Sequence, residues 1–121
     1  MSTSTRQRLP NRRDNRIETL EVAGQTFEAC VGLCPETGQP RELFLNAGKE
    51  GSLLNALLAD AAVVISIALQ HGIPAAALAK SIGRLPAGPV TPADLEGPQP
   101  GRVPASPIGA ALDLLRRFEE N

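Results

Sequence analysis

Apolar and polar positions alternate in the first third of the chain, which is the pattern of β-strands. Within residues 26–33 every second residue is apolar, so an extended segment would have one apolar face. Residues 17–22 and 41–46 follow the same pattern less completely. The segments between them, 23–25 and 35–40, contain the glycine and proline that are typical of turns. The pattern predicts three antiparallel strands in a meander.

The spacing of apolar residues becomes helical after residue 52. Residues 53–71 predict a long helix, with Ser52 as its N-cap and Gly72 as the glycine that follows its end. Pro74 suits the start of a second helix over residues 75–82. The two helices would form a hairpin that packs on the strands.

The last third of the chain is a proline-rich segment followed by one more helix. Residues 86–104 are rich in proline and glycine, which is typical of an extended or unstructured linker. Ser106 and Pro107 suit the N-cap and first position of a helix. Its predicted apolar face consists of Ile108, Leu112, Leu115 and Phe118, with Asp113, Arg116 and Glu120 facing water.

The predicted fold class is α+β: a three-stranded antiparallel meander packed on a helical hairpin, plus a tethered C-terminal helix. The chain divides into a basic arm, the α+β domain, a linker and the terminal helix, at residues 1–16, 17–85, 86–104 and 105–121.

The long helix is apolar on all sides, so it needs cover on all sides. Three strands and one short helix offer little surface for that cover in a chain of 121 residues. The terminal helix could fold back over it, and a second copy of the chain could cover the rest. We therefore expect a homodimer.

Charge divides the chain into a basic arm and an acidic body. The first 16 residues carry five basic side chains against one acidic, a charge of +4, and the remainder carries −5. An arm of this kind can bind nucleic acid or can be a solvated leader. The arginines concerned are Arg6, Arg8, Arg12, Arg13 and Arg16. Residues 57–84 also have the spacing of a helix-turn-helix unit, although the second helix offers few polar side chains for bases.

Candidate metal and catalytic residues are few. Cys30, Cys34 and His71 are weak candidates for a zinc site, because strand positions four apart are separated by ~13 Å. The same separation argues against an unstrained disulfide. No acid, base and nucleophile can be grouped from the sequence, so we expect no cofactor and no complete enzyme.

The glycine-rich loop before the long helix is the best candidate site for an anion. Backbone N–H groups at a helix start, together with a lysine, can hold a phosphate or the phosphates of a nucleotide. The loop residues are Gly48, Lys49, Gly51 and Ser52. Glu50 would oppose an anion, and the order of residues is not that of a P-loop.

Three runs of sequence resemble the TSCPD domain of cobalamin-dependent ribonucleotide reductases. They are R-E-L-F-L-N-A-G-K-E-G-S at 41–52, I-S-I-A-L-Q-H-G-I-P at 65–74 and L-A-K-S-I at 78–82. The run P-A-S-P-I-G-A-A-L-D-L-L at 104–115 is similar to short members of the family. The Thr-Ser-Cys-Pro-Asp segment that names the family is absent, as are the reductase barrel and its catalytic cysteines.

The resemblance implies an accessory or regulatory binding module in deoxyribonucleotide synthesis, with a reductase or another protein as partner. A nucleic-acid-associated protein that uses the arginine arm is the alternative. The N-terminus has no apolar stretch for export, and residues 53–69 fall short of the ~20 apolar residues that span a bilayer. We therefore expect a cytoplasmic protein with no membrane partner.

Overall fold

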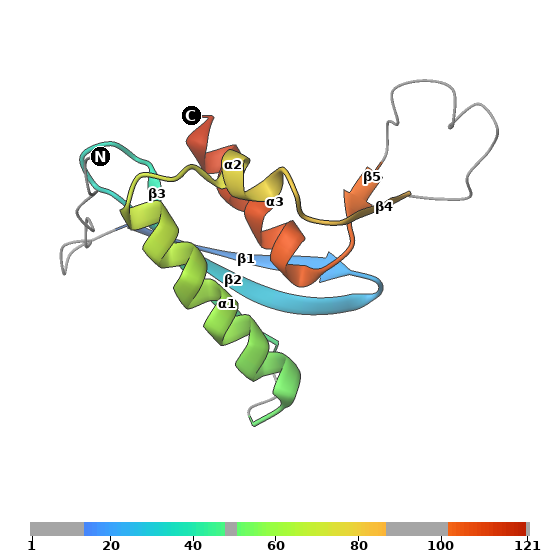
Figure 1. Cartoon of the computed structure of the whole chain (residues 1–121). Coiled ribbons are helices and arrows are strands. Elements are labelled where there is room, and N and C mark those ends of the chain that lie inside the picture. The colour runs from blue at the N-terminus through green and yellow to red at the C-terminus, as the bar shows by residue number, and fades with distance from the viewer. Residues whose placement is uncertain (1–13, 48–50, 87–101, 121) are drawn as a thin grey trace, which may run out of the picture.

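A computed structural model describes residues 14–47, 51–86 and 102–120 of the chain. Its centre is an antiparallel sheet with the strand order β1-β2-β3, which confirms the predicted meander and the α+β class (Figure 1). The strands are β1 (Asp14–Val22), β2 (Gln25–Leu33) and β3 (Pro40–Asn46). The described residues also form three helices and a two-stranded ribbon; they are α1 (Leu53–Gln70), α2 (Ala75–Ala79), α3 (Pro107–Glu119), β4 (Arg84–Pro86) and β5 (Arg102–Pro104).

The first hairpin explains why β1 is longer than the sequence predicts. Ala23 and Gly24 both have positive φ, 52° and 79°, which is the two-residue turn that matches the twist of paired strands. From this turn the pairing with β2 continues as far as Asp14, opposite Leu33. Arg16, which we predicted in the arm, therefore lies inside the strand. Pairing depends on backbone groups, so the polar side chains of this edge strand do not prevent it.

Both ends of α1 lie where the sequence predicts them. The Ser52 hydroxyl accepts a hydrogen bond from the backbone N–H of Asn55 (3.1 Å). At the other end Gly72 has a φ of +87°, and the N–H of Ile73 donates to the Ala68 carbonyl (3.0 Å). This is the usual C-terminal capping by glycine, in which N–H groups that follow the helix donate to its last free carbonyls.

Polar side chains of α1 hold the helix along the outer edge of β3. Ser66 Oγ accepts a hydrogen bond from the Leu43 N–H (2.9 Å) and donates one to the Leu43 carbonyl (3.2 Å). Asn55 Oδ1 accepts from the N–H of Ala47, the residue after β3, at 3.1 Å. Gln70 Nε2 donates to the Arg41 carbonyl (3.1 Å). The helix thus satisfies backbone groups that an edge strand would otherwise expose.

The terminal helix packs on one face of the sheet and on α2, with few contacts to α1 (Figure 1). The Ser106 hydroxyl accepts from the Gly109 N–H (3.2 Å), and Pro107 opens the helix, as predicted. We expected the terminal helix to fold back over the long helix; α3 shares the core with the inner side of α1, and the outer side of α1 stays exposed. The apolar faces of β2 and β3 need cover themselves, and α3 supplies it.

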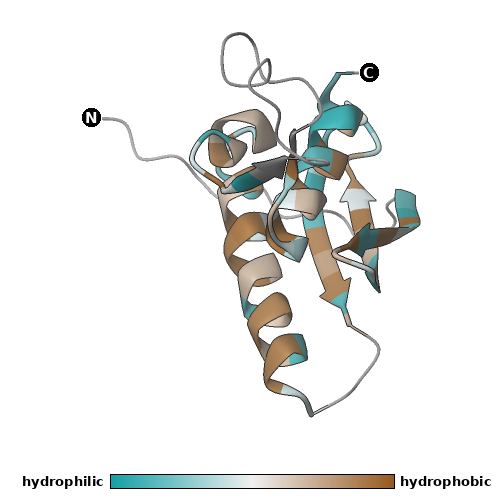
Figure 2. Ribbon diagram, turned by 90° about the vertical axis from the view of Figure 1, so that its right-hand side faces the viewer, coloured by the Kyte–Doolittle hydropathy of each residue, from teal (hydrophilic) through white to brown (hydrophobic). Residues whose placement is uncertain are grey.

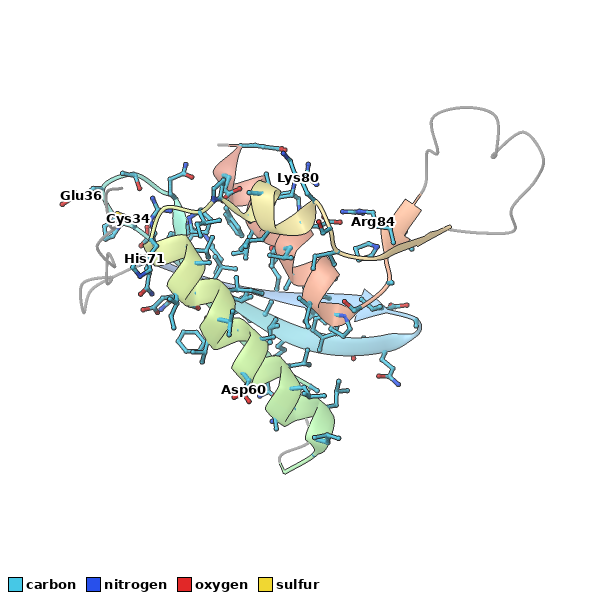
Figure 3. All side chains as sticks on the ribbon, in the orientation of Figure 1. Cys34, Glu36, Asp60, His71, Lys80 and Arg84 are labelled. Atoms are coloured by element: carbon cyan, nitrogen blue, oxygen red, sulfur yellow. The ribbon has the colours of Figure 1, made fainter. Side chains whose placement is uncertain are left out.

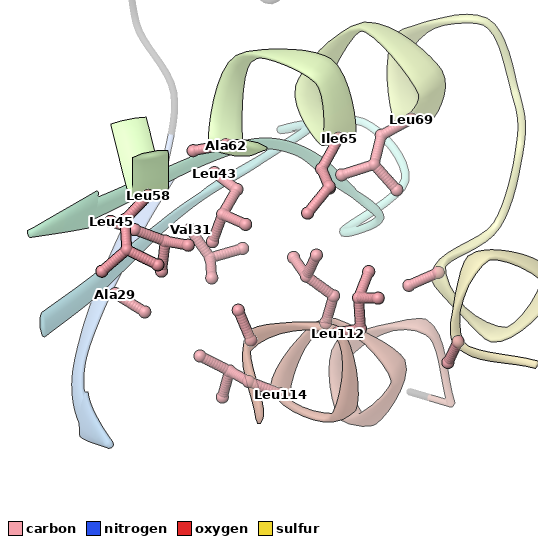
Figure 4. Close-up of a cluster of buried hydrophobic side chains, with 14 of the residues drawn as sticks. Ala29, Val31, Leu43, Leu45, Leu58, Ala62, Ile65, Leu69, Leu112 and Leu114 are labelled. Carbon is pink, nitrogen blue, oxygen red and sulfur yellow. The ribbon is translucent and has the colours of Figure 1, made fainter. Parts of the chain in front are cut away.

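The core lies between the sheet, the inner face of α1 and α3 (Figure 4). Leu112 and Leu115 are buried there, as the helical spacing predicts. Leu114 is also buried, and Asp113 pairs with Arg84 (2.6 Å) instead of facing water alone. The largest fully buried side chains are Leu43, Leu69, Leu112, Leu114, Leu115, Val31 and Pro40.

The prediction for the second helix needs correction. This helix ends at Ala79, three residues early, and the chain then turns so that Ile82 lies against α3: a Cβ added to Gly109 would lie 3.0 Å from the Ile82 Cγ2 atom. β4 ends at Pro86, the first residue of the predicted linker, and β5 forms the last three residues of that linker; the two strands pair as an antiparallel ribbon. The ends of the segment that we predicted to be extended or unstructured are therefore paired strands. Residues 87–101 lie outside the described part of the chain.

Candidate binding surface

The outer face of α1 is apolar and exposed. Leu53, Leu57 and Val64 have exposed fractions of 76%, 57% and 67%, and Ile67 has 37%. Together with Asp60 they follow one another at steps of four and three residues, which places them in a single line along the helix. We call Leu53, Leu57, Asp60, Val64 and Ile67 the α1 seam. Figure 2 shows the hydrophobic colour along the length of α1, and Figure 3 shows Asp60 pointing away from the sheet.

The helix that carries this seam has the length and apolar composition that a membrane crossing needs. Core helices of folded domains meet the same criterion. Ser66 and Gln70 attach this helix to β3 through hydrogen bonds, so its inner face is part of the fold. Only its outer face is available to another molecule.

A second apolar area lies on the sheet face opposite α3. Ile17 pairs with Cys30, and Cys30 pairs with Phe44, so these three side chains lie side by side across the sheet. Ile17 and Phe44 have exposed fractions of 71% and 56%. A shallow hollow of about 340 Å³ joins this face to Ala59 on the flank of α1. The exposed apolar surface thus runs from β1 across the sheet to the helix.

The candidate metal ligands do not form a site. Cys30 lies on the open sheet face, and Cys34 lies in the turn after β2, at the end of the molecule where Figure 3 also shows His71. Both cysteines are free thiols. Among the described residues no group of three or more His, Cys, Asp or Glu side chains could hold a metal ion.

Cys34 has the more reactive environment of the two thiols. A hydrogen bond with the Thr37 side chain, followed by hydrogen bonds with the backbone of Thr37 and Glu36, lowers the pKa of the Cys34 thiol. These bonds favour the thiolate, which is the nucleophilic form. A lowered pKa by itself defines no reaction.

The predicted anion loop is only partly described. Gly51 has a φ of +78°, and the Ser52 hydroxyl accepts the capping hydrogen bond of α1. Gly48 and Lys49 lie outside the described residues. Glu28 lines the hollow described above and also a second hollow beside Asn46 and Ala47, where β3 ends and the chain leads into this loop. The Glu28 carboxylate disfavours an anion there. Phosphate binding by the loop stays a prediction.

The residues predicted to bind nucleic acid do not form a surface within the described part of the chain. Arg6, Arg8, Arg12 and Arg13 lie outside the described residues, and Arg16 lies on β1. The second helix of the predicted helix-turn-helix unit is only five residues long, with Ala75 and Ala79 buried. Arg84 is engaged by Asp113. The predicted helix-turn-helix unit is therefore a packed helical hairpin. A helix that reads a DNA groove needs a longer exposed face than this second helix has.

Comparison with known proteins identifies the family. A family model described as the TSCPD domain matches residues 5–115. The chain belongs to the TSCPD domain family. The vitamin B12-dependent ribonucleotide reductase of Rhodopirellula baltica is 38% identical over 69 residues, which are 57% of this chain and 6% of the reductase. The corresponding reductase of Agrobacterium fabrum is 35% identical over 71 residues, 57% of this chain and 5% of the reductase.

This TSCPD chain therefore matches only about one twentieth of the length of these curated reductases. No solved structure matches it. The runs that carry the family resemblance include most of β3, the cap of α1 and the last third of α1, which contains Ser66 and Gln70. In the structure these runs fix the helix on the sheet edge, and this attachment determines which face of the helix is exposed.

Proposed function

We propose that this TSCPD domain is a non-catalytic binding module that docks on a cobalamin-dependent ribonucleotide reductase through the α1 seam. The observation that carries the proposal is the exposure of Leu53, Leu57 and Val64 on a helix whose opposite face is fixed in the core. Monomeric proteins rarely leave large contiguous apolar areas in water, and such areas usually mark interfaces. The family relationship supplies the candidate partner, because the curated relatives are reductases that contain a matching segment.

The shape of the seam indicates the kind of surface that it fits. Steps of four and three residues present an apolar line along the helix, flanked by the exposed Leu54 and Val63, and this geometry suits a second helix packed alongside. Asp60 interrupts the line near its middle. A partner helix with apolar residues and one basic side chain opposite Asp60 would match it, whereas an entirely apolar partner would leave a carboxylate without a counter-charge.

Replacing Val64 by glutamate tests this function. We expect the purified chain to bind a purified cobalamin-dependent reductase from the same cell in calorimetric titration. Val64→Glu should weaken that binding by about 30-fold or more, since a charge would be buried within the contact. Val64 is 67% exposed, so the variant should fold normally.

Val103→Glu is the matched control. Val103 is an exposed valine on β5, away from α1, and its replacement should leave the affinity unchanged. If the wild-type chain gives no binding heat, or if Val64→Glu binds as well as Val103→Glu, the α1 seam is not the docking surface.

A further inference from the structure

β1 is an edge strand whose outer side has no strand partner among the described elements. The sheet order is β1-β2-β3, and α1 covers the far edge at β3. β1 is nine residues long, and Asp14 to Thr19 are all exposed. A long edge strand presents a row of backbone donors and acceptors to which another strand can pair.

The hydrogen bonds of Leu43 show which backbone groups of β1 face outward. The N–H and the carbonyl of Leu43 both hydrogen-bond to Ser66 on α1, so they point away from β2. Successive residues of an antiparallel strand direct these groups to opposite sides, so the N–H and carbonyl of Phe44 point toward β2. Phe44 pairs with Cys30, so the N–H and carbonyl of Cys30 bond to β3 and do not face β1. Ile17 is the β1 partner of Cys30, so the N–H and carbonyl of Ile17 point outward, away from β2. Arg16 agrees with this assignment, because its Nη1 atom donates to the Asn15 carbonyl on the same outer edge (3.1 Å).

We propose that the chain forms a homodimer in which the β1 edges of two copies pair antiparallel about Ile17, giving one six-stranded sheet. In this register Arg16 of each copy lies opposite Glu18 of the other, so the dyad produces two pairs of opposite charge. The two Ile17 side chains, each 71% exposed in one chain, meet on the open sheet face. Cross-strand pairs of opposite charge and of β-branched residues are the contacts that stabilise paired strands.

Neighbouring registers are less favourable. Centring the pairing on Arg16 places two arginines opposite each other, and centring it on Glu18 places two carboxylates together. Centring it on Thr19 leaves Ile17 opposite Glu21. Centring it on Asn15 also pairs opposite charges, Asp14 with Arg16, but only residues 14–16 of β1 would then be paired. Like charges directly opposite destabilise a strand pair, so charge and the length of the pairing together favour the Ile17 register.

The α1 seam is a poorer site for self-association. Asp60 lies at the midpoint between Leu53 and Ile67, so an antiparallel pairing of two seams brings two Asp60 carboxylates together. The dimer that we first expected on α1 is therefore assigned to β1. The inference goes beyond the proposed function, since it leaves the seam free for the reductase.

Charge reversal on β1 tests the dimer. In sedimentation equilibrium at micromolar concentration, the wild-type chain should have twice its single-chain mass of 12.7 kDa. Arg16→Glu and Glu18→Arg should each weaken the dimer about tenfold or more, because each replaces two attractive pairs by two repulsive ones. The double variant Arg16→Glu/Glu18→Arg should restore the wild-type mass. All of these side chains are exposed, so circular dichroism should show an unchanged fold.

Val64→Glu separates this result from the proposed function, because it should leave the dimer intact while it impairs reductase binding. A wild-type chain of single mass would overturn the proposal. So would a dimer that withstands both single reversals, or one that the double reversal fails to restore.

Discussion

Leu69→Ala is expected to lower the free energy of unfolding by about 2–5 kcal/mol, the range for removing a buried leucine side chain. Leu69 has an exposed fraction of 0% and lies on the inner face of α1, within the core that α3 closes. The alanine would leave a cavity that the packed neighbours can fill only in part. Denaturation by urea, followed by circular dichroism, measures the change.

Leu53→Ala is the control for this experiment, because it makes the same chemical change on the same helix. Leu53 has an exposed fraction of 76%, so the change should be within about 0.5 kcal/mol of zero. Equal losses from the two variants would mean that the outer face of α1 is covered in the isolated chain, and the orientation of the helix described here would be wrong.

Ser66→Ala is expected to lower the free energy of unfolding by about 2–4 kcal/mol, since two buried backbone groups would each lose their partner. The Ser66 hydroxyl serves both the N–H and the carbonyl of Leu43, and Ser66 is 8% exposed. Alanine is itself a better helix former than serine, so a purely local effect would have the opposite sign.

Ser81→Ala supplies the comparison for Ser66→Ala. Ser81 is exposed in the turn after α2, and its replacement should change stability little. Thermal or chemical denaturation of both variants distinguishes the cases. A stability of Ser66→Ala equal to that of Ser81→Ala would show that the helix does not depend on the β3 edge.

Local signals in the sequence predicted the elements that depend on local physics. The hairpin at Ala23 and Gly24, the Ser52 cap and the Gly72 end each depend on a few neighbouring residues, and each was predicted correctly. The early end of α2 was not predicted; after it the chain turns and Ile82 lies against α3, a contact with residues more than 20 positions away. The β4-β5 pairing is also non-local.

The orientation of α1 was the main feature that apolar spacing could not predict. A helix that is apolar all round has no preferred face by that measure. The signal was present in its polar residues instead: Asn55, Ser66 and Gln70 lie on one side, and all three bond to the backbone at the β3 edge. Exposure of the seam follows from this attachment and from the packing of α3 on the sheet, both of which are tertiary properties.

The role of Asp60 becomes clear only when the orientation of α1 is known. In the sequence it is one polar residue in an apolar run, which only weakens the case for a membrane span. In the structure it lies in the middle of the exposed seam, where it disfavours two seams pairing and favours a partner with a basic side chain.

Hydrogen–deuterium exchange of the chain, alone and mixed with the reductase, tests the central claim most directly. Docking on the α1 seam should slow exchange in peptides that cover residues 53–67, because bound helices open less often. Peptides of β4 and β5 should exchange at the same rate in both samples. Protection of 53–67 is the result that we predict. Binding that protects another part of the chain and leaves 53–67 unchanged would contradict the assignment of this face as the docking surface.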